Sequence, residues 1–552
     1  MQPVREVYVI GIDGGTFRII DPLMDRGELP AFRHIVENGV RSVLHSTIPA
    51  NSAVAWSSFM TGKNPGKHGV FGFISYSPAR DRLTLTNGSY VKSRTLWDIA
   101  SEAGRSVAVL NVPLTYPPKP VNGLLVSGMD ASSLKNLTYP PEFGEELVRV
   151  CPSYQIDLPH VQHDRFQASL GSRVTQLVEA RKQAMLHMLE KAEPQLFVGV
   201  FTCTDRIQHH FWHAADVTHP KHRLAKDEER EIIADTYRQI DRILTLFLKR
   251  MSPETTLFVV SDHGFCGSTR RFMVNLWLGQ RGWLRPAKRP ANSTWSRVLH
   301  GVKRRPRLYM WARTLKNAIP GLEQLAVRER AMNRSLSDKI DWSATKAYYF
   351  PPGIRINLKD REPFGVVERA EFEPLRQAIM RALTSLCDEA GHPVFAEVRR
   401  REELYFGPHL DLAPDIILEP SVGNNDPRQN FSLGRRMRIS ETGGVFAEAG
   451  TSGEHDSNGI LLGIGRPLQR GSHRDGAAIT DIAPTVLHLL GLPIPSDMDG
   501  KVLLDFFSPE FINQTTPRYT DQSAEGEEPE WDYGDLDEEL VRERLRELGY
   551  LA

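Results

Sequence analysis

Cysteine is scarce in this sequence and shows no paired spacing. The 552 residues include four cysteines and no CxxC pair; they are Cys151, Cys203, Cys266 and Cys387. Four scattered thiols in a chain of this length exclude a disulfide scaffold. They favour a reducing compartment, so we expect a cytoplasmic protein.

Long apolar runs and an excess of one charge are also absent. No segment approaches the roughly 20 apolar residues that cross a bilayer, and the opening MQPVREVYVIGIDGG has no basic region or cleavage site of a secretory signal. Lys plus Arg and Asp plus Glu both number 68, so no overall field draws the chain to nucleic-acid polymers or an anionic membrane. With 40% hydrophobic residues, the composition is that of a soluble globular protein. The oligomeric state is not indicated.

Short apolar segments alternate with helical patterns along most of the chain. Buried strands are expected at 7–12, 106–111, 196–201, 256–260, 414–418 and 459–464. Helical patterns lie between them, notably at 53–60, 96–103, 170–191, 228–250 and 481–490. This alternation predicts an α/β fold with a mostly parallel sheet that is covered by helices on both faces.

The pattern is interrupted after residue 278. Residues 282–330 are rich in Arg, Lys, Trp and Pro and show helical stretches without a strand pattern. We therefore divide the chain into a first core segment (1–278), a mainly helical inserted cap (279–405), a second core segment (406–508) and a terminal region (509–552). Within the last region, 521–537 is acidic and predicts a mobile linker, and 538–548 predicts a short helix.

Acidic residues and histidines follow the predicted strands repeatedly. The candidates are Asp13, Asp205, His209, Asp262, His263 and His455. Because the carboxyl ends of parallel strands meet at one edge of a sheet, these side chains should converge there. Six oxygen and nitrogen ligands are enough for two adjacent divalent ions. Taken singly, Asp13 could cap a helix, Asp205 and His209 could form a surface pair, and His455 could be a solvated loop histidine.

Six blocks of sequence carry a family resemblance. They are GIDGGTF, NSAVAWSSFMTGKNPGKHGVFGF, TDRIQHHFWH, VVSDHGF, GEHDSNGILLGIG and TDIAPTVLHLLGLPIPSDMDG. In this order the chain resembles the type I phosphodiesterase/nucleotide pyrophosphatase branch of the alkaline phosphatase superfamily. The resemblance implies an alkaline-phosphatase-like three-layer sandwich with an inserted cap. It also implies that the enzyme hydrolyses a small-molecule phosphate ester or diester.

The resemblance also implies a role for each candidate residue. Asp205, His209 and His455 would bind the ion that activates water, and Asp13, Asp262 and His263 would bind the ion that holds the nucleophile. The nucleophile position falls on Ser52, at the start of a predicted helix, where free N–H groups favour a phosphoryl anion. An ordinary N-cap serine is the other interpretation of Ser52. The mixture of Asp oxygens and His nitrogens suits Zn²⁺ and tolerates Mn²⁺.

One departure from the family and several alternatives stay open. The family has Asn where this sequence has Phe73, which weakens any inference of a nucleotide leaving group; the N–H after Ser52 or the side chain of Asn51 could replace that amide. Lys63 and Lys67 could contact phosphate, but a structural turn is the favoured interpretation. The same scaffold also suits a phosphomonoesterase, a phosphomutase or a catalytically inactive binding protein.

Overall fold

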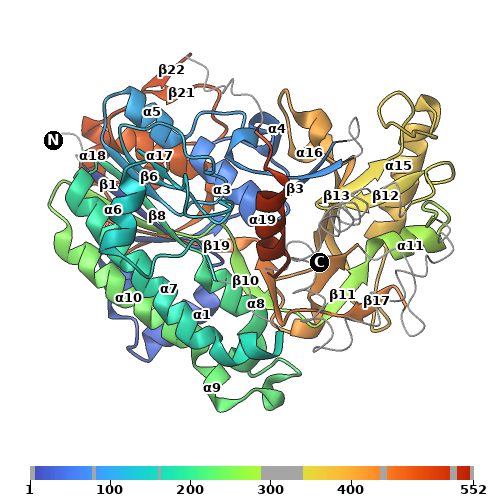
Figure 1. Cartoon of the computed structure of the whole chain (residues 1–552), viewed down its shortest axis with the longest axis horizontal. Helices are drawn as coiled ribbons and strands as arrows, with labels where there is room; N and C mark the ends of the chain where they lie inside the picture. Colours follow the sequence, from blue (N-terminus) through green and yellow to red (C-terminus); the bar gives the residue numbers. More distant parts are fainter. Residues whose placement is uncertain are drawn as a thin grey trace, which may run out of the picture.

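The computed structural model describes residues 6–77, 82–158, 163–287, 340–435, 444–521 and 531–547. Its centre is a nine-stranded sheet (Figure 1). In spatial order the strands are β20 (Ser472–Ala478), β2 (Val40–His45), β19 (Asn458–Ile464), β9 (Thr255–Val260), β1 (Glu6–Ile12), β8 (Leu196–Phe201), β5 (Val107–Leu110), β6 (Gly123–Val126) and β7 (Thr138–Tyr139).

The middle of this sheet is parallel and fully buried. Strands β9, β1, β8, β5 and β6 pair in parallel, and every residue of β8 and β9 is buried. Such strands are continuously apolar because both of their faces are covered. Strands β19 and β7 run against their neighbours. Since β19 is antiparallel to β9, its amino end lies at the same edge as the carboxyl ends of the parallel strands.

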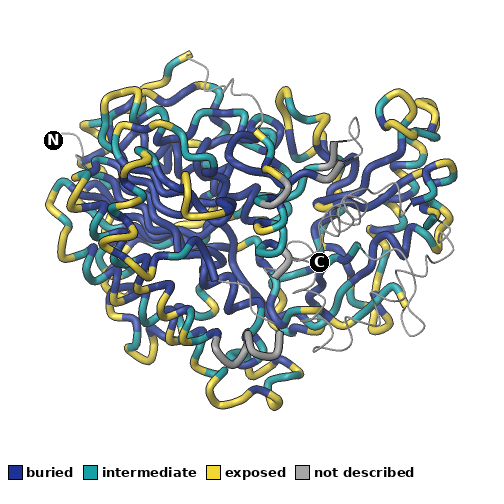
Figure 2. The backbone as a smooth tube through the Cα atoms, in the orientation of Figure 1, coloured by how far each residue is buried: buried dark blue, intermediate teal, exposed yellow. Residues whose placement is uncertain are grey.

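Helices cover both faces of the sheet. Helix α7 (His163–Ala192) and helix α5 (Leu96–Glu102) both contact β5, from opposite sides. Helix α10 (Ile232–Arg250) packs beside α7, and α17 (Ile482–Leu489) packs beside α5. Figure 1 shows α7 and α10 below the sheet and α5 and α17 above it, and Figure 2 shows the buried backbone concentrated between these layers. The predicted three-layer α/β sandwich is confirmed.

The lobe on the right of Figure 1 has its own hydrophobic core and its own sheets. Four strands pair in the order β12 (Ala347–Phe350), β13 (Gly353–Ile356), β15 (Ile416–Pro420) and β14 (Phe395–Arg400). Three more pair as β16 (Phe431–Gly434), β11 (Arg270–Met273) and β17 (Phe446–Glu448). Two helices, α11 (Val274–Gln280) and α15 (Arg369–Thr384), belong to the same lobe.

One expectation for this region is wrong. The strand predicted at 414–418 was assigned to the central sheet, but β15 pairs with β13 and β14 in the lobe. The described part of the cap contains strands β12, β13 and β14 beside helix α15, and the expectation of a mainly helical cap stays a prediction. Most of the helical segment expected at 282–330 lies outside the described residues. The domain boundaries themselves stay a prediction.

The terminal region differs from the expected mobile linker where it is described. Asn87 donates to the carbonyl oxygen of Trp531 at 2.7 Å, and the Tyr533 hydroxyl donates to the carbonyl oxygen of Asp130 at 2.6 Å. Helix α19 (Asp535–Glu547) then lies across the front of the molecule between the two lobes (Figure 1). Residues 531–534 are therefore fixed to the core. None of the helices in the described ranges is long and apolar enough to span a membrane.

Candidate metal centre and nucleophile

The predicted ligands meet at one edge of the central sheet. Asp13 directly follows β1, and Asp262 and His263 follow β9. Asp205 and His209 lie one turn apart in helix α8 (Cys203–Ala215), which follows β8. His455 lies in β18 (Gly453–Asp456), just before β19. All six side chains are buried, so each needs a polar partner or an ion.

Asp13, Asp262 and His263 form the first group. Their ligand atoms lie within 4.8 Å of one another. Trp56 donates from Nε1 to Asp13 Oδ2 at 3.2 Å, and the Gly14 N–H donates to Asp262 Oδ1 at 3.1 Å. These donors orient both carboxylates. The other oxygen of Asp262, Oδ2, is buried and lies 3.2 Å from His263 Nε2.

Asp205, His209 and His455 form the second group. His455 Nε2 lies 3.0 Å from His209 Nε2 and 3.1 Å from Asp205 Oδ1, and His209 Nε2 lies 3.4 Å from the same oxygen. The His263 and His455 rings are stacked with their centroids 3.7 Å apart. As a result, Asp205, His263 and His455 also fall within 4.8 Å of one another. The two groups are thus contiguous.

Backbone carbonyls fix which nitrogen each histidine presents. The Nδ1 atoms of His209, His263 and His455 lie 2.9, 2.9 and 3.0 Å from the carbonyl oxygens of Gly453, Gly264 and Ala50. A carbonyl only accepts, so each Nδ1 carries the proton and donates it. In the neutral rings the Nε2 lone pairs then face the centre, which is the usual orientation of histidines that bind metals.

When all three rings are neutral, several acceptor atoms therefore face one another without a donor between them. The Nε2 lone pairs of His209 and His455 are 3.0 Å apart, and His263 Nε2 lies 3.2 Å from Asp262 Oδ2. Two acceptors at these distances repel each other unless a proton or a cation lies between them. The donor set, the burial and the facing lone pairs fit divalent metal ions.

The pKa shifts agree with this interpretation. Burial, the carboxylate of Asp262 and that of Asp205 raise the pKa of Asp13 well above its usual value. Burial also raises the pKa of Asp262, to about 7. Burial lowers the pKa of His455, but the hydrogen bond and charge of Asp205 outweigh it and raise that pKa to about 9. The centre favours added positive charge, as a proton or as a metal ion.

Ser52 is the hydroxyl that faces the first group. It is the first residue of helix α3 (Ser52–Thr61) and is fully buried. Its Oγ lies 3.0 Å from His263 Nε2 and 3.4 Å from Asp13 Oδ1. Asn51 caps the helix by accepting from the Ala53 N–H at 3.1 Å. Ser52 thus combines a helix N-terminus, which favours anions, with direct contact to two predicted metal ligands.

The other hydroxyls of this block have different partners. Thr47 donates to the carbonyl oxygen of Pro49 at 3.0 Å, and Ser57 donates to that of Ala53 at 2.7 Å. Ser58 Oγ lies 3.0 Å from His68 Nε2. Only Ser52 among these hydroxyls contacts the predicted ligands.

The two lysines considered as phosphate contacts are bound elsewhere. Lys63 is 2% exposed and donates to Asp497 Oδ2 at 2.6 Å, and Lys67 forms an ion pair with Asp499. Asp497 and Asp499 belong to the block near residue 500, so these pairs join two distant segments. This geometry supports a structural role for both lysines rather than contact with phosphate.

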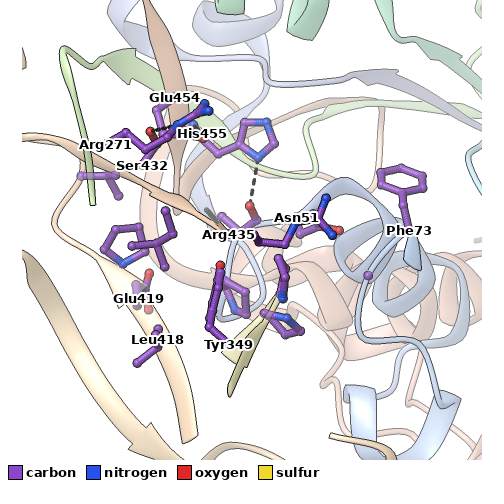
Figure 3. A pocket seen from close by; sticks show the side chains of 18 of the residues that line it. Asn51, Phe73, Arg271, Tyr349, Leu418, Glu419, Ser432, Arg435, Glu454 and His455 are labelled. Carbon is purple, nitrogen blue, oxygen red and sulfur yellow. Dashed lines mark hydrogen bonds between the residues drawn. The ribbon is translucent and has the colours of Figure 1, made fainter. Parts of the chain in front are cut away.

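A cleft of about 200 Å³ lies between the predicted metal ligands and the second lobe (Figure 3). His209 and His455 line its inner wall, together with Asn51. Phe73, which replaces the family Asn, lines the same cleft and is 3% exposed. Where the family has an amide, this chain therefore presents an apolar ring to the cleft.

Arg206 is a residue of this site that the sequence did not indicate. It is 3% exposed, and its Nη1 lies 3.4 Å from Asp205 Oδ2. Its Nη2 donates to Asp157 Oδ2 at 2.6 Å. An arginine next to a buried aspartate in a helix was a weak signal, because its main partner lies 49 residues away.

Comparisons with known proteins identify the family of this chain. A family model for type I phosphodiesterase / nucleotide pyrophosphatase matches residues 7–426, which is more than half of the chain. No curated protein matches in a sequence comparison.

Several solved structures resemble the chain. Phosphonoacetate hydrolase from Sinorhizobium meliloti 1021 is 16% identical with a TM-score of 0.52, over 87% of this chain and 94% of that one. A mutant of the alkaline phosphatase PafA is 14% identical with a TM-score of 0.52, over 92% of this chain and 100% of that one. Human ectonucleotide pyrophosphatase / phosphodiesterase 5 is 12% identical with a TM-score of 0.48, over 91% and 100%. At these identities the first two likenesses show the fold, and the family model carries the assignment. The chain belongs to the type I phosphodiesterase / nucleotide pyrophosphatase family and is a phosphoric ester hydrolase.

Proposed function

We propose that this protein is a phosphodiesterase or nucleotide pyrophosphatase that uses Ser52 as its nucleophile and two divalent metal ions. Zinc is the expected metal and manganese an alternative. The observation that carries the proposal is the two pairs of facing acceptor atoms, His209 with His455 at 3.0 Å and His263 with Asp262 at 3.2 Å. The cytoplasmic location inferred from the cysteines stays a prediction.

The six ligands divide as the resemblance implies. Asp13, Asp262 and His263 would hold one ion next to Ser52, and Asp205, His209 and His455 would hold the other. When bound, these ions would lower the pKa of the serine hydroxyl and of water and would neutralise charge on the phosphate oxygens.

The chain's own groups define the two chemical steps. The Ser52 hydroxyl loses its proton as its oxygen forms a bond to phosphorus, and the bond to the leaving ester oxygen breaks on the opposite side, so that this oxygen leaves with the electron pair and can take up a proton. Water then attacks the same phosphorus, the Ser52–phosphorus bond breaks, and the serine recovers its proton. The N-terminus of α3 stabilises the anion in both steps.

Asn51 is our candidate for the amide missing at position 73. Its Oδ1 caps α3, its Nδ2 remains a donor, and the residue lines the cleft next to the His455 wall. Figure 3 shows it between His455 and Phe73. The backbone N–H groups that follow Ser52 lie at the same helix end.

The decisive experiment compares Ser52→Ala with Ser57→Ala. Both remove a buried hydroxyl from the same helix, but the Ser57 hydroxyl donates to the carbonyl oxygen of Ala53 rather than contacting a predicted ligand. We expect Ser52→Ala to lower kcat by about 10³-fold or more, with unchanged metal content, and Ser57→Ala to change kcat by less than about fivefold. Equal activity of the two variants would show that Ser52 is not the nucleophile.

Metal and substrate measurements separate the remaining alternatives. Purified protein should contain about two equivalents of zinc or manganese, and His455→Ala should lower the occupancy of one site only. Bis-p-nitrophenyl phosphate should be hydrolysed faster than p-nitrophenyl phosphate. The reverse order would indicate a phosphomonoesterase or phosphomutase, and protein without bound metal or turnover would indicate an inactive binding protein.

A further inference from the structure

The wall of the cleft opposite the metal ligands is mostly apolar. Among the described residues it includes aromatic, proline and aliphatic side chains: Phe350, Pro351, Pro352, Leu418, Val422 and Leu433. Such a wall suits an organic group that remains attached to the phosphate, because it removes apolar surface from water. Two arginines interrupt this wall, Arg271 and Arg435.

The side chain of Arg271 is held in place by its neighbours. Its Nε donates to Ser432 Oγ at 3.1 Å, a contact drawn in Figure 3. Its stem passes over Gly434, where an added Cβ would lie 3.1 Å from Cδ, and its guanidinium lies over Gly450, 3.5 Å from such a Cβ. Ser432 and the two glycines fix the side chain, so little rotamer entropy remains to be lost on binding.

The two Nη groups of Arg271 remain available to donate hydrogen bonds to a ligand. Within the described ranges no carboxylate oxygen lies within 4.0 Å of the Arg271 guanidinium, and its side-chain hydrogen bond to Ser432 uses Nε. Both Nη groups remain as a planar pair of donors, which matches the geometry of a carboxylate or phosphate. Tyr349 lines the same wall, and Figure 3 shows its side chain pointing into the cleft beneath Arg435.

Two carboxyl groups also line the cleft. Glu454 Oε1 accepts from the backbone N–H of His455 at 3.2 Å. Glu419 lies on the far wall, where burial and the neighbouring Glu397 raise its pKa to about 7. Glu419 therefore carries only part of a negative charge at neutral pH, and the arginine side of the cleft remains attractive to an anion.

We propose that Arg271, held by Ser432 and assisted by Tyr349, binds a second oxyanion of the substrate. Resting on the proposed function, this inference names the substrate class. It is a phosphodiester or pyrophosphate whose organic arm is largely apolar and carries a carboxylate or a further phosphate group.

Matched synthetic substrates test the inference. One is p-nitrophenyl meta-carboxybenzyl phosphate and the other is its meta-carbamoyl analogue, which has the same shape without the charge. We expect the metal-loaded wild type to prefer the carboxylate by about tenfold or more in kcat/KM. Arg271→Met should reduce this preference to about twofold or less, and Arg271→Lys should keep only part of it, because it lacks the planar fork.

A control variant and the contrary outcomes complete the test. Arg281→Met removes an exposed arginine that stacks on Trp277 in the same lobe, outside the cleft lining, and should keep the full preference. Equal hydrolysis of both substrates by the wild type, or a preference that survives in Arg271→Met, would overturn the inference while leaving the hydrolase intact. Hydrolysis of neither substrate by metal-loaded protein would instead count against the proposed function. A third substrate with a phosphonate in place of the carboxylate shows which oxyanion is preferred.

Discussion

Arg206 and Asp157 form an ion pair at 2.6 Å in which the side chains are only 2% and 1% exposed. Arg206 Nη1 also lies 3.4 Å from Asp205 Oδ2, so the ion pair helps to hold the predicted metal ligand Asp205 in place. Burial alone would raise the pKa of Asp157, but the charges of Arg206 and Arg544 hold it below its usual value. Arg544 comes from α19 and also donates to the carbonyl oxygens of Met129 and Ala131 at 2.6 Å. The terminal helix therefore contributes to the support of the predicted ligand Asp205.

Asp157→Asn should destabilise the fold strongly, because it removes the charge that Arg206 contacts at 2.6 Å and leaves the buried guanidinium with only the longer contact to Asp205, at 3.4 Å. Breaking one partner of a buried ion pair costs about 3–5 kcal/mol, measured as the free energy of unfolding in urea. The control is Glu190→Gln, which breaks the exposed pair with Arg250 and should cost about 1 kcal/mol or less.

The pH dependence of the wild type gives a second measurement of this pair. Because the pKa of Asp157 is held below its unfolded value, its stabilisation is present above about pH 4 and is lost as the pH falls through the folded pKa. Asp157→Asn should lose this acid-sensitive part of the stability. Equal costs for Asp157→Asn and Glu190→Gln would contradict the interpretation.

Lys63→Met should affect stability rather than catalysis. Lys63 is 2% exposed, whereas its partner Asp497 is 29% exposed and can regain water. We expect a loss of about 1–3 kcal/mol in the free energy of unfolding and a kcat/KM within about twofold of the wild type. The reverse result, normal stability with a large loss of kcat/KM, would show that Lys63 contacts the substrate phosphate.

The location of the site follows from sequence because strand ends are local features. Asp13, Asp262 and His263 each come directly after an apolar run that could only be a buried strand, and the structure brings them within 4.8 Å of one another. Their convergence requires only that these strands be parallel neighbours. Their roles as metal ligands stay predictions.

The direction of a strand and the sheet to which it belongs were harder to predict. His455 lies in β18, just before β19, and it reaches the site only because β19 is antiparallel to β9. The strand β15 is as apolar as those of the central sheet, yet it pairs with β13 and β14. An apolar run indicates burial on both faces but does not specify the partner strand. Arg206, Arg271 and the segment beginning at Trp531 act through partners distant in sequence, which local patterns do not reveal.

Asn51→Asp separates the capping role of Asn51 from its proposed role toward phosphate. Asp caps helices as well as Asn does and suits the helix N-terminus, so the free energy of unfolding should change by about 0.5 kcal/mol or less. The variant nevertheless removes the amide donor and adds negative charge next to the phosphate position. We expect kcat/KM to fall by about 10²-fold. An unchanged kcat/KM would leave the backbone N–H groups of α3 as the replacement for the family Asn.

Glu419→Gln should change how stability depends on pH. Glu419 is 9% exposed and lies opposite Glu397 in the register of β14 and β15, and burial followed by the charge of Glu397 raises its pKa to about 7. Between about pH 4.5 and pH 7 the folded protein therefore keeps a proton that the unfolded chain has released. The stability that this group contributes therefore falls as the pH rises through that window.

Glutamine cannot ionise, so the free energy of unfolding of Glu419→Gln, measured in urea at a series of pH values, should decline by about 1–3 kcal/mol less than that of the wild type. Glu397→Gln should produce part of the same effect, because it removes the second cause of the shift. Parallel pH profiles for the wild type and Glu419→Gln would show that Glu419 is already ionised in the folded protein at low pH, and the cleft would then carry a full negative charge opposite Arg271.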